Sequence, residues 1–434
     1  MRLVGRLSGA FATGVLMLAG AAGCAVAGTS AGPSAAAMST APSSNGANGA
    51  NGQPAFVTAG RAVATSGRAA TATRTPAATH TPAATGTSAG AGITAASTLT
   101  AGNPNGHAAV PTAGLAVDTS HTDQVIGDGS PAGCTSAAVV QAVAKGGIIT
   151  FDCGPAPVTI TMTATAKVVN TSHQIVLDGG GKVTLSGAGK IRILYMNTCD
   201  SAQTITTDDC WEQQWPQLVV QNIAFTDAYS ATPQPGAGLP SIAQSSATSY
   251  GGGAIFDQGG QLKVVNSVFT GNQCYASGPD LGGAAIRAYG MDLQVPVYIT
   301  DDTFTDNSCS NGGALSGLYA NFAVYNSLMT GNKAIGFGSN PAASGTVGGG
   351  SGGAIYTDGN GYNLLIDGSV ITGNSAREGG GAIFYVVDAD GGTLSIDDST
   401  LSNNASGVFQ NAPGIFDDVN GAEANPSENG SSVS

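Results

Sequence analysis

Apolar and polar positions alternate within an eleven-residue segment that recurs six times along the chain. The copies are Leu218–Ala228, Leu262–Asn272, Val297–Asn307, Phe322–Asn332, Leu364–Asn374 and Leu394–Asn404. Their first, third and eighth positions are apolar in every copy, and their ninth position is always Thr or Ser. Because alternation with a period of two is strand spacing rather than helix spacing, each copy predicts short β-strands.

A turn phrase and a glycine phrase accompany these strands. The eleventh position is Asn in five of the six copies, and Gly-Gly-Ala-Ile or a close variant follows the first five copies. Asn tolerates tight turns and Gly-Gly marks a corner, so each repeat predicts three short strands separated by corners. Stacked repeats of this kind predict an all-β fold, a right-handed parallel β-helix of about eight coils. An internal ladder of stacked amides is expected at Asn272, Asn307, Asn332, Asn374 and Asn404.

The same residues resemble a known family. Phe269–Asn272 and Phe304–Asn307, alternating with Gly-Gly-Ala-Ile, are similar to the repeats of the polymorphic outer-membrane proteins. More broadly, the repeats resemble pectate-lyase-like β-helix proteins. The resemblance implies the solenoid fold, but such folds carry lyases, hydrolases, adhesins and inert spacers alike.

The N-terminus predicts export. Arg2 and Arg6 precede the apolar run Phe11–Ala22, which is too short to anchor the chain in a membrane. We expect a signal peptide at residues 1–27, cleaved after Ala25-Val26-Ala27; alternatively, a lipoprotein signal ends at a lipidated Cys24. The protein would then be secreted or held at the cell surface, and would meet the membrane only through that lipid.

Composition divides the remainder of the chain. Residues 28–115 are rich in Ala, Thr, Ser, Gly and Pro and contain no acidic residue, which predicts a disordered tether. All 27 acidic residues lie at or after Asp118, beside nine of the 14 Lys and Arg. Nucleic acid is therefore an unsuitable partner for the β-helix expected at residues 116–416. An acidic, disordered tail is expected at residues 417–434, and we expect a monomer.

One helix and three disulfides are expected. Residues Thr135–Lys145 show a helical apolar face that begins after a Thr or Ser cap and ends at Gly146, which places a capping helix before the first coil. Six cysteines lie beyond Cys24, as expected for an exported domain. Cys274 and Cys309 each lie two residues after a ladder Asn, which predicts a bond between adjacent coils. A Cys134–Cys153 bond would hold the capping helix, a Cys199–Cys210 bond would close an insertion, and a metal site is the alternative.

Two clusters are candidate binding surfaces. The first holds both tryptophans beside three carboxylates: Asp208, Asp209, Trp211, Glu212 and Trp215. The second is the position after each Gly-Gly-Ala-Ile phrase: Phe256, Arg287, Ser316, Tyr356 and Phe384. If the preceding aliphatic residue points inward, strand alternation turns this column outward as an aromatic strip suited to a glycan. Packing of the indoles on the disulfide, or loops that cover the strip, are the alternatives.

Catalysis and metal binding have weaker candidates. Asp367 and Asp397 occupy one column on successive coils, where they would share a proton or Ca²⁺ or act only as solvated turn residues. Arg287 is the single candidate for the base of a polysaccharide lyase, since it alone combines a cation with an expected outward position. We therefore expect binding of a polysaccharide or another surface, without turnover. A carbohydrate-active enzyme, lyase before hydrolase, and a purely structural spacer are the alternatives.

Overall fold

The computed structural model describes residues 99–211, 213–230, 251–276, 278, 281–292, 294–338 and 348–434. The expected signal peptide, Cys24, the expected tether as far as residue 98, and Glu212 lie outside this part of the chain. Within it, no helix has the length and apolar character needed to cross a membrane.

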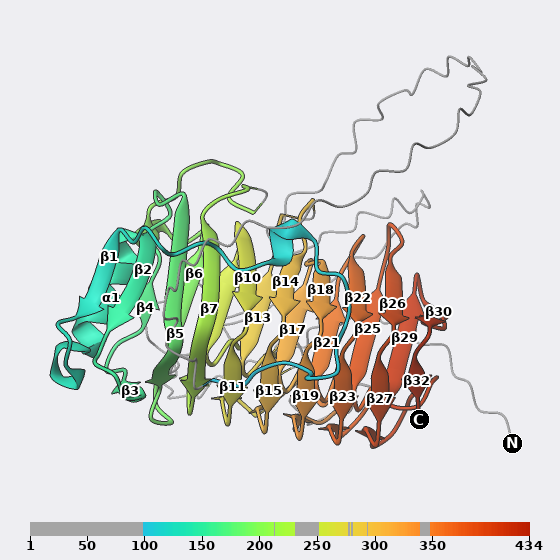
Figure 1. Cartoon of the computed structure of the whole chain (residues 1–434). Coiled ribbons are helices and arrows are strands. Elements are labelled where there is room, and N and C mark those ends of the chain that lie inside the picture. Colours follow the sequence, from blue (N-terminus) through green and yellow to red (C-terminus); the bar gives the residue numbers. More distant parts are fainter. Residues whose placement is uncertain are drawn as a thin grey trace, which may run out of the picture. The chain divides into compact units, whose positions relative to one another are not determined.

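The described chain forms an all-β solenoid in which the strands of successive repeats stack to form three sheets (Figure 1). It contains a single α-helix, α1 (Ser136–Lys145). The strands of the described residues pair in parallel, except for the antiparallel hairpin of β29 and β30. Sheet A has 17 strands: β1 (Gln124–Gly127), β2 (Gly147–Asp152), β3 (Val158–Thr161), β5 (Gln174–Ser186), β7 (Gln217–Thr226), β10 (Gln261–Val265), β11 (Val268–Thr270), β14 (Val297–Thr300), β15 (Thr303–Thr305), β18 (Phe322–Tyr325), β19 (Leu328–Thr330), β22 (Asn363–Asp367), β23 (Val370–Thr372), β26 (Thr393–Asp397), β27 (Thr400–Ser402), β31 (Ser427–Asn429) and β32 (Ser432–Val433).

The other two sheets are smaller. Sheet B has nine strands: β4 (Ala166–Lys167), β6 (Leu194–Asn197), β9 (Ile255–Gln258), β13 (Ile286–Tyr289), β17 (Leu315–Leu318), β21 (Ile355–Asp358), β25 (Ile383–Val387), β29 (Ile415–Val419) and β30 (Ala422–Glu423). Sheet C has six: β8 (Tyr229–Ser230), β12 (Gln273–Cys274), β16 (Ser308–Cys309), β20 (Lys333–Ala334), β24 (Ser375–Ala376) and β28 (Ala405–Ser406). The sheet C strands follow the Asn turn and are an addition to the three strands per repeat that the sequence predicts.

The predicted register is confirmed. Strand β10 pairs with β7 and β14, and β11 pairs with β7 and β15, so equivalent residues of successive repeats stack directly. The inward Phe225, Phe269 and Phe304 form a stack with ring centroids 4.9 Å apart and planes within 7°. The apolar positions of the repeat therefore make one continuous core along the solenoid.

The Asn ladder is also confirmed. Each amide nitrogen donates to the side-chain oxygen of the next Asn at 2.9 Å, from Asn272 through Asn307, Asn332 and Asn374 to Asn404. The same oxygen accepts the backbone N–H of the preceding Asn, and the amide nitrogen also donates to a backbone carbonyl, Phe304 O in the case of Asn332. Every member is buried, so the amides satisfy turn groups that water does not reach.

A second ladder occupies the corner between the two sheet A strands of each repeat. Backbone N–H groups donate to the hydroxyl of the next coil in the series Ser327, Ser369, Ser399 and Ser431. Asp302 takes the place of a Ser in this series and accepts the N–H of Ser267 at 2.7 Å. Burial raises the pKa of this enclosed Asp302 carboxyl well above its usual range. The sequence analysis did not predict this ladder.

The expected helix is present. Thr135 caps α1 by accepting the N–H of Ala138, and Gly146 follows the last residue with a φ of +78°. Val139, Ala142 and Val143 are buried and join the main core. Strand β5 shifts register between Asp178 and Val183 in its pairing with β7.

Residues 99–115, which the sequence assigned to the disordered tether, are instead placed against the body. Gly102 N–H donates to Thr303 Oγ1, Ala108 N–H to Asn326 Oδ1, and Leu115 O accepts from Lys263 Nζ at 2.7 Å. The low-complexity composition does not predict these contacts, because they use backbone groups of the segment rather than apolar side chains. We call residues 99–119 the strap.

The expected disordered tail is also wrong in part. Residues of β31 and β32 pair in parallel with β26 and β27, and Ser431 continues the Ser ladder. Acidity therefore does not prevent pairing here, because the strands contribute small polar residues in the register of the preceding coil. The solenoid extends beyond Phe416.

All three expected disulfides are present. Cys134 is bonded to Cys153, Cys199 to Cys210 and Cys274 to Cys309, with Cα atoms 5.7, 5.1 and 4.7 Å apart. The last joins β12 and β16, one column on neighbouring coils, as the register predicts.

We expect Asn332→Ala to lower the free energy of unfolding by about 1–3 kcal/mol, because it leaves buried partners on both neighbouring coils without hydrogen bonds. Chemical denaturation followed by circular dichroism measures the change. Asn105→Ala is the control, since Asn105 is exposed on the strap. Equal midpoints for the two variants would contradict a stabilising role for the ladder.

Candidate functional site

The column after the Gly-Gly-Ala-Ile phrase points away from the core, as expected, but it is not exposed. Phe256 pairs in register with Arg287, and Tyr356 with Phe384. Phe256 and Arg287 are fully buried, and Tyr356 and Phe384 are 6% and 8% exposed. The expected exposed aromatic strip is therefore wrong: the column is an internal packing layer on the outer side of sheet B.

Two aromatic clusters explain this burial. Phe256 stacks on Tyr195, with centroids 5.5 Å apart, and the Arg192 guanidinium lies 4.8 Å from its ring centroid. Farther along sheet B, Tyr356, Phe384 and Phe416 stack in turn at 5.0 and 5.3 Å. The edge of Phe409 packs against the last of these rings. Stacking of neighbouring rings along sheet B, with Phe409 from the segment after β28, thus buries rings that strand alternation alone would expose.

Arg287 is enclosed between the two clusters. Its Nη1 donates to Ser316 Oγ at 3.0 Å, and its guanidinium lies 5.8 Å from the ring of Tyr289. A guanidinium that is fully buried does not face a polymer in solvent. Its candidacy as a lyase base required exposure to solvent, and the burial of Arg287 contradicts that exposure.

The two tryptophans rest on different partners. Trp211 meets Tyr289 edge to face, and Trp215 stacks on His173, each at 4.6 Å between centroids. Both indoles are half-buried, whereas Asp208 and Asp209 on the Cys199–Cys210 loop are exposed. The indoles therefore cover the body with part of their surface.

The acidic pair has the expected register. Asp367 of β22 pairs with Asp397 of β26, and Asn429 donates to Asp397 Oδ1 at 2.7 Å. Burial, and then the charges of Asp397 and Asp398, raise the pKa of Asp367. The described residues contain no group of three or more His, Cys, Asp or Glu placed to hold a metal ion. A Ca²⁺ ion takes about six to eight oxygen ligands, of which this pair would supply only a part.

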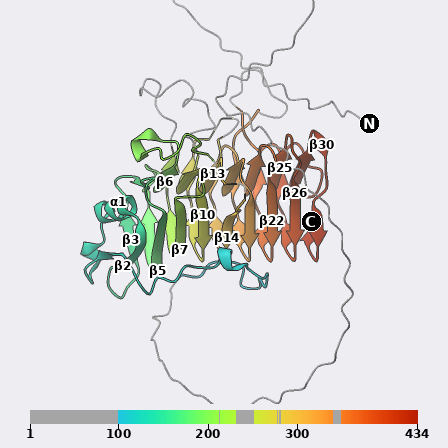
Figure 2. The same ribbon diagram turned by 90° about the horizontal axis from the view of Figure 1, so that it is seen from above.

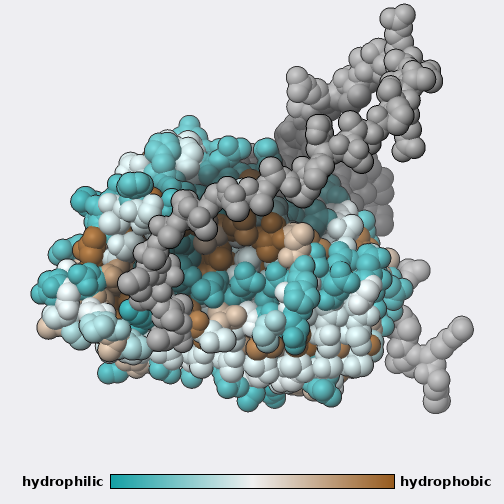
Figure 3. Space-filling view, in the orientation of Figure 1, coloured by the Kyte–Doolittle hydropathy of each residue, from teal (hydrophilic) through white to brown (hydrophobic). Residues whose placement is uncertain are grey.

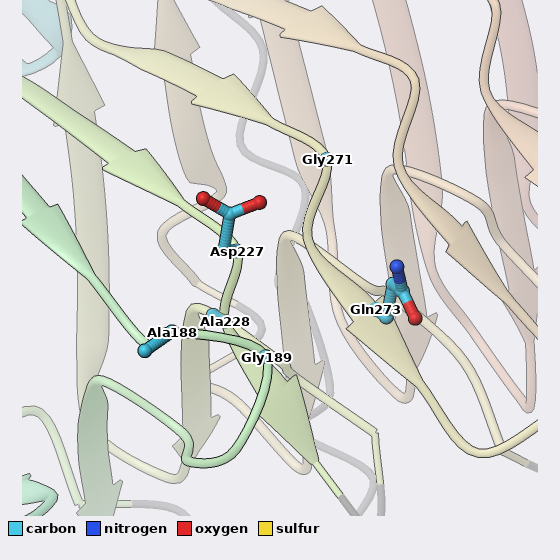
Figure 4. A pocket seen from close by; sticks show the side chains of 6 residues that line it. All are labelled: Ala188, Gly189, Asp227, Ala228, Gly271 and Gln273. Carbon is cyan, nitrogen blue, oxygen red and sulfur yellow. The ribbon is translucent and has the colours of Figure 1, made fainter.

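A surface hollow of about 370 Å³ lies at the corner after β7 (Figure 4). Its lining consists of Ala188, Gly189, Asp227, Ala228, Gly271 and Gln273. Only Asp227 and Gln273 bring polar side chains, and Asp227 already accepts a hydrogen bond from Thr226 Oγ1 at 3.0 Å. The hollow has no aromatic wall and no cation.

A different surface, which the sequence analysis missed, follows the sheet C strands. Tyr275, Phe337 and Val408 are 38%, 46% and 60% exposed, and they are three of the six large exposed apolar residues in the described chain. The Arg377 guanidinium lies 5.0 Å from the Phe337 ring centroid. We call Tyr275, Ile335, Phe337, Arg377 and Val408 the edge row.

The Asn ladder gives the edge row its alignment. Tyr275, Ile335 and Arg377 each lie three residues after a ladder Asn. Backbone bonds continue the stacking there, from Ile335 N–H to Cys309 O and from Arg377 N–H to Ala334 O. The sequence therefore contains a signal for Tyr275, Ile335 and Arg377 but not for Phe337 and Val408, which lie five and four residues after a ladder Asn.

Two carboxyls are buried without hydrogen-bond partners in the described chain: both oxygens of Asp257 and Oδ1 of Asp417. Burial raises the pKa of Asp257 well above its usual range. For Asp417, burial and then the charge of Asp418 raise the pKa to about 6. The folded state thus binds protons more tightly than the unfolded chain at both positions.

We expect Phe384→Ala to lower the free energy of unfolding by about 3–5 kcal/mol, because it leaves a cavity between Tyr356 and Phe416. Phe337→Ala removes an aromatic ring of the edge row and should change stability by less than about 0.5 kcal/mol. Denaturant midpoints of both variants check this. A small effect of Phe384→Ala would mean that the column is open to solvent.

A raised folded-state pKa of an acid stabilises the fold below the unfolded pKa of 3.8, and this stability is lost as pH rises through the folded pKa. We therefore expect Asp417→Asn to flatten the decline in thermal midpoint between pH about 4 and about 6. Asp208→Asn, which changes an exposed carboxyl, should keep the wild-type slope. A variant slope equal to that of wild type in this window would contradict the assignment.

No protein-family model matches the sequence, and no curated protein and no solved structure matches it.

Proposed function

We propose that the protein is an exported cell-surface protein that binds a polysaccharide through the edge row. In this proposal the body is a right-handed parallel β-helix, closed at its N-terminal end by α1. The repeated order of sheet A, sheet C and sheet B strands supports the coiled path. The three disulfides are typical of proteins that leave the reducing cytosol, which supports export.

The exposed apolar and aromatic surface of the edge row carries the proposal. Aromatic faces stack on the C–H faces of sugar rings, and a guanidinium donates hydrogen bonds to hydroxyls or acidic groups. Phe337 and Arg377 supply this combination at one place. Ile335 and Arg377 occupy the same position on successive coils, with Phe337 beside them, so this part of the row can contact neighbouring residues of one polymer.

Charge distinguishes the same surface from the rest of the repeats. Residues 217–434 contain four cations: Lys263, Arg287, Lys333 and Arg377. Lys263 and Arg287 are buried. Lys333, in β20, and Arg377, the residue after β24, are exposed. The cationic side chains that remain open to solvent in this region thus lie at the edge row, on an otherwise acidic body.

A glycan array probed with the full-length protein, followed by titration with the best ligand, tests the proposal. We expect Phe337→Ala and Arg377→Ala each to weaken binding at least about fivefold, because each removes half of the stacked pair. Leu115→Ala is the matched control, since Leu115 is also 46% exposed but lies on the strap. Absence of glycan binding by wild type, or equal binding by the edge variants, would refute the proposal.

A further inference from the structure

The strap crosses the outer face of sheet A at an angle to its strands (Figures 1 and 2). From Leu99 it follows the corner near Asn326 and Gly368, and it then returns over β14, where the short 3₁₀ helix η1 (Thr112–Gly114) lies. Beyond η1 it passes Lys263 and continues toward β1. It thus spans coils that are far apart in the sequence.

Two side-chain amides hold the backbone of the strap at two points each. Asn326 Oδ1 accepts from Ala108 N–H at 2.8 Å, and Asn326 Nδ2 donates to Ala108 O at 3.2 Å. Gln221 makes the same pair of bonds with Val117, at 2.8 and 3.0 Å. An amide that contacts both the N–H and the C=O of one residue reproduces the bonding of a neighbouring β-strand.

The strap is otherwise held mainly by single side-chain bonds. Thr303 Oγ1 accepts from Gly102 N–H, and Thr119 Oγ1 donates to Asp178 Oδ2 at 2.7 Å. No strap residue belongs to a sheet, and one backbone-to-backbone bond, from Asn103 N–H to Asn326 O, ties it to the strands of the body. Two strap side chains also bond the body, Thr119 through Asp178 and Asn103 Nδ2 through Gly368 O at 2.9 Å, but most of the contacts join side chains of the body to main-chain groups of the strap.

The face of sheet A along this path combines apolar side chains with the polar contacts of Gln221 and Lys263. The outward side chains of Val176, Val219, Val265 and Ala323 are buried, and an atom added at Gly114 of the strap would lie 3.0 Å from the ring of Tyr298. Figure 3 shows brown, apolar residues at the centre of this face between hydrophilic margins. Close approach requires Gly in the strap, since a Cβ at Gly106 would lie 2.7 Å from Asn326 Oδ1.

We propose that the outer face of sheet A is a binding groove for extended polypeptide main chain, with the strap as its resident occupant. The groove reads backbone N–H and C=O groups through Asn326 and Gln221, and it accepts side chains of any kind where they point to solvent. A second extended peptide with Gly at the close-approach positions fits the same contacts once the strap is displaced.

The test uses the full-length protein with Ala108→Pro and Val117→Pro, which removes the two N–H groups that donate to the amides and leaves the groove unchanged. The matched control is Ala109→Pro with Ala116→Pro, at exposed neighbouring positions. Hydrogen exchange should show at least about tenfold faster exchange in residues 99–119 of the first variant, with sheet A still protected. Unaltered strap exchange, or loss of protection throughout sheet A, would overturn the proposal.

Binding of a labelled synthetic peptide of residues 99–119, measured by fluorescence anisotropy, completes the test. It should bind the displaced variant and fail to bind wild type and the control, whose grooves are occupied. A scrambled peptide that keeps Gly102, Asn103, Gly106, Gly114, Thr119 and both prolines in place should bind with similar affinity. Failure of the native peptide to bind the displaced variant refutes the groove, and failure of the scrambled peptide alone refutes main-chain recognition.

Discussion

The register of the strands in the solenoid depends on the amide-to-amide hydrogen bonds along the Asn column. Each turn buries polar backbone groups, and the Asn of one coil satisfies groups that belong to its neighbours. A coil that slipped by one residue would lose these bonds and reverse the inward and outward side chains together. Length variation is therefore confined to segments outside the ladder: three long insertions follow the eleven-residue segment, and the one that holds the Cys199–Cys210 loop lies between β6 and β7.

This confinement explains which features the sequence predicts. The strands, the stacked Phe residues, the Asn ladder and the Cys274–Cys309 bond follow from positions within one repeat, so local spacing was sufficient. The burial of Tyr356 and Phe384 depends on segments distant in the sequence, including Phe409 and Phe416. Alternation gave their direction correctly but contained no information about what packs over them.

The strap and the last coil were misassigned for a related reason. Composition predicts disorder where apolar side chains are too few to offset the entropy of ordering. Ala108 and Val117 are held through their backbone groups, and Ser431 through its place in a hydroxyl ladder, so neither contributes an apolar signal. The preceding coils already hold their hydrogen-bonding groups in place, so a segment that binds to them needs few apolar side chains of its own.

The same corner chemistry produces both the fold and the strap contacts. Asn326 adopts a φ of +49° in the corner between β18 and β19, a conformation that Asn tolerates better than most residues. That conformation belongs to the turn, yet the side chain is left with an acceptor and a donor, and both contact Ala108 of the strap. The next coil has Gly368 at the equivalent corner position. Gly keeps the turn but has no side chain that could bond the backbone of the strap. The Asn326 contact therefore depends on which residue this one corner carries, so a repetitive scaffold can acquire a site at one coil without altering its repeat.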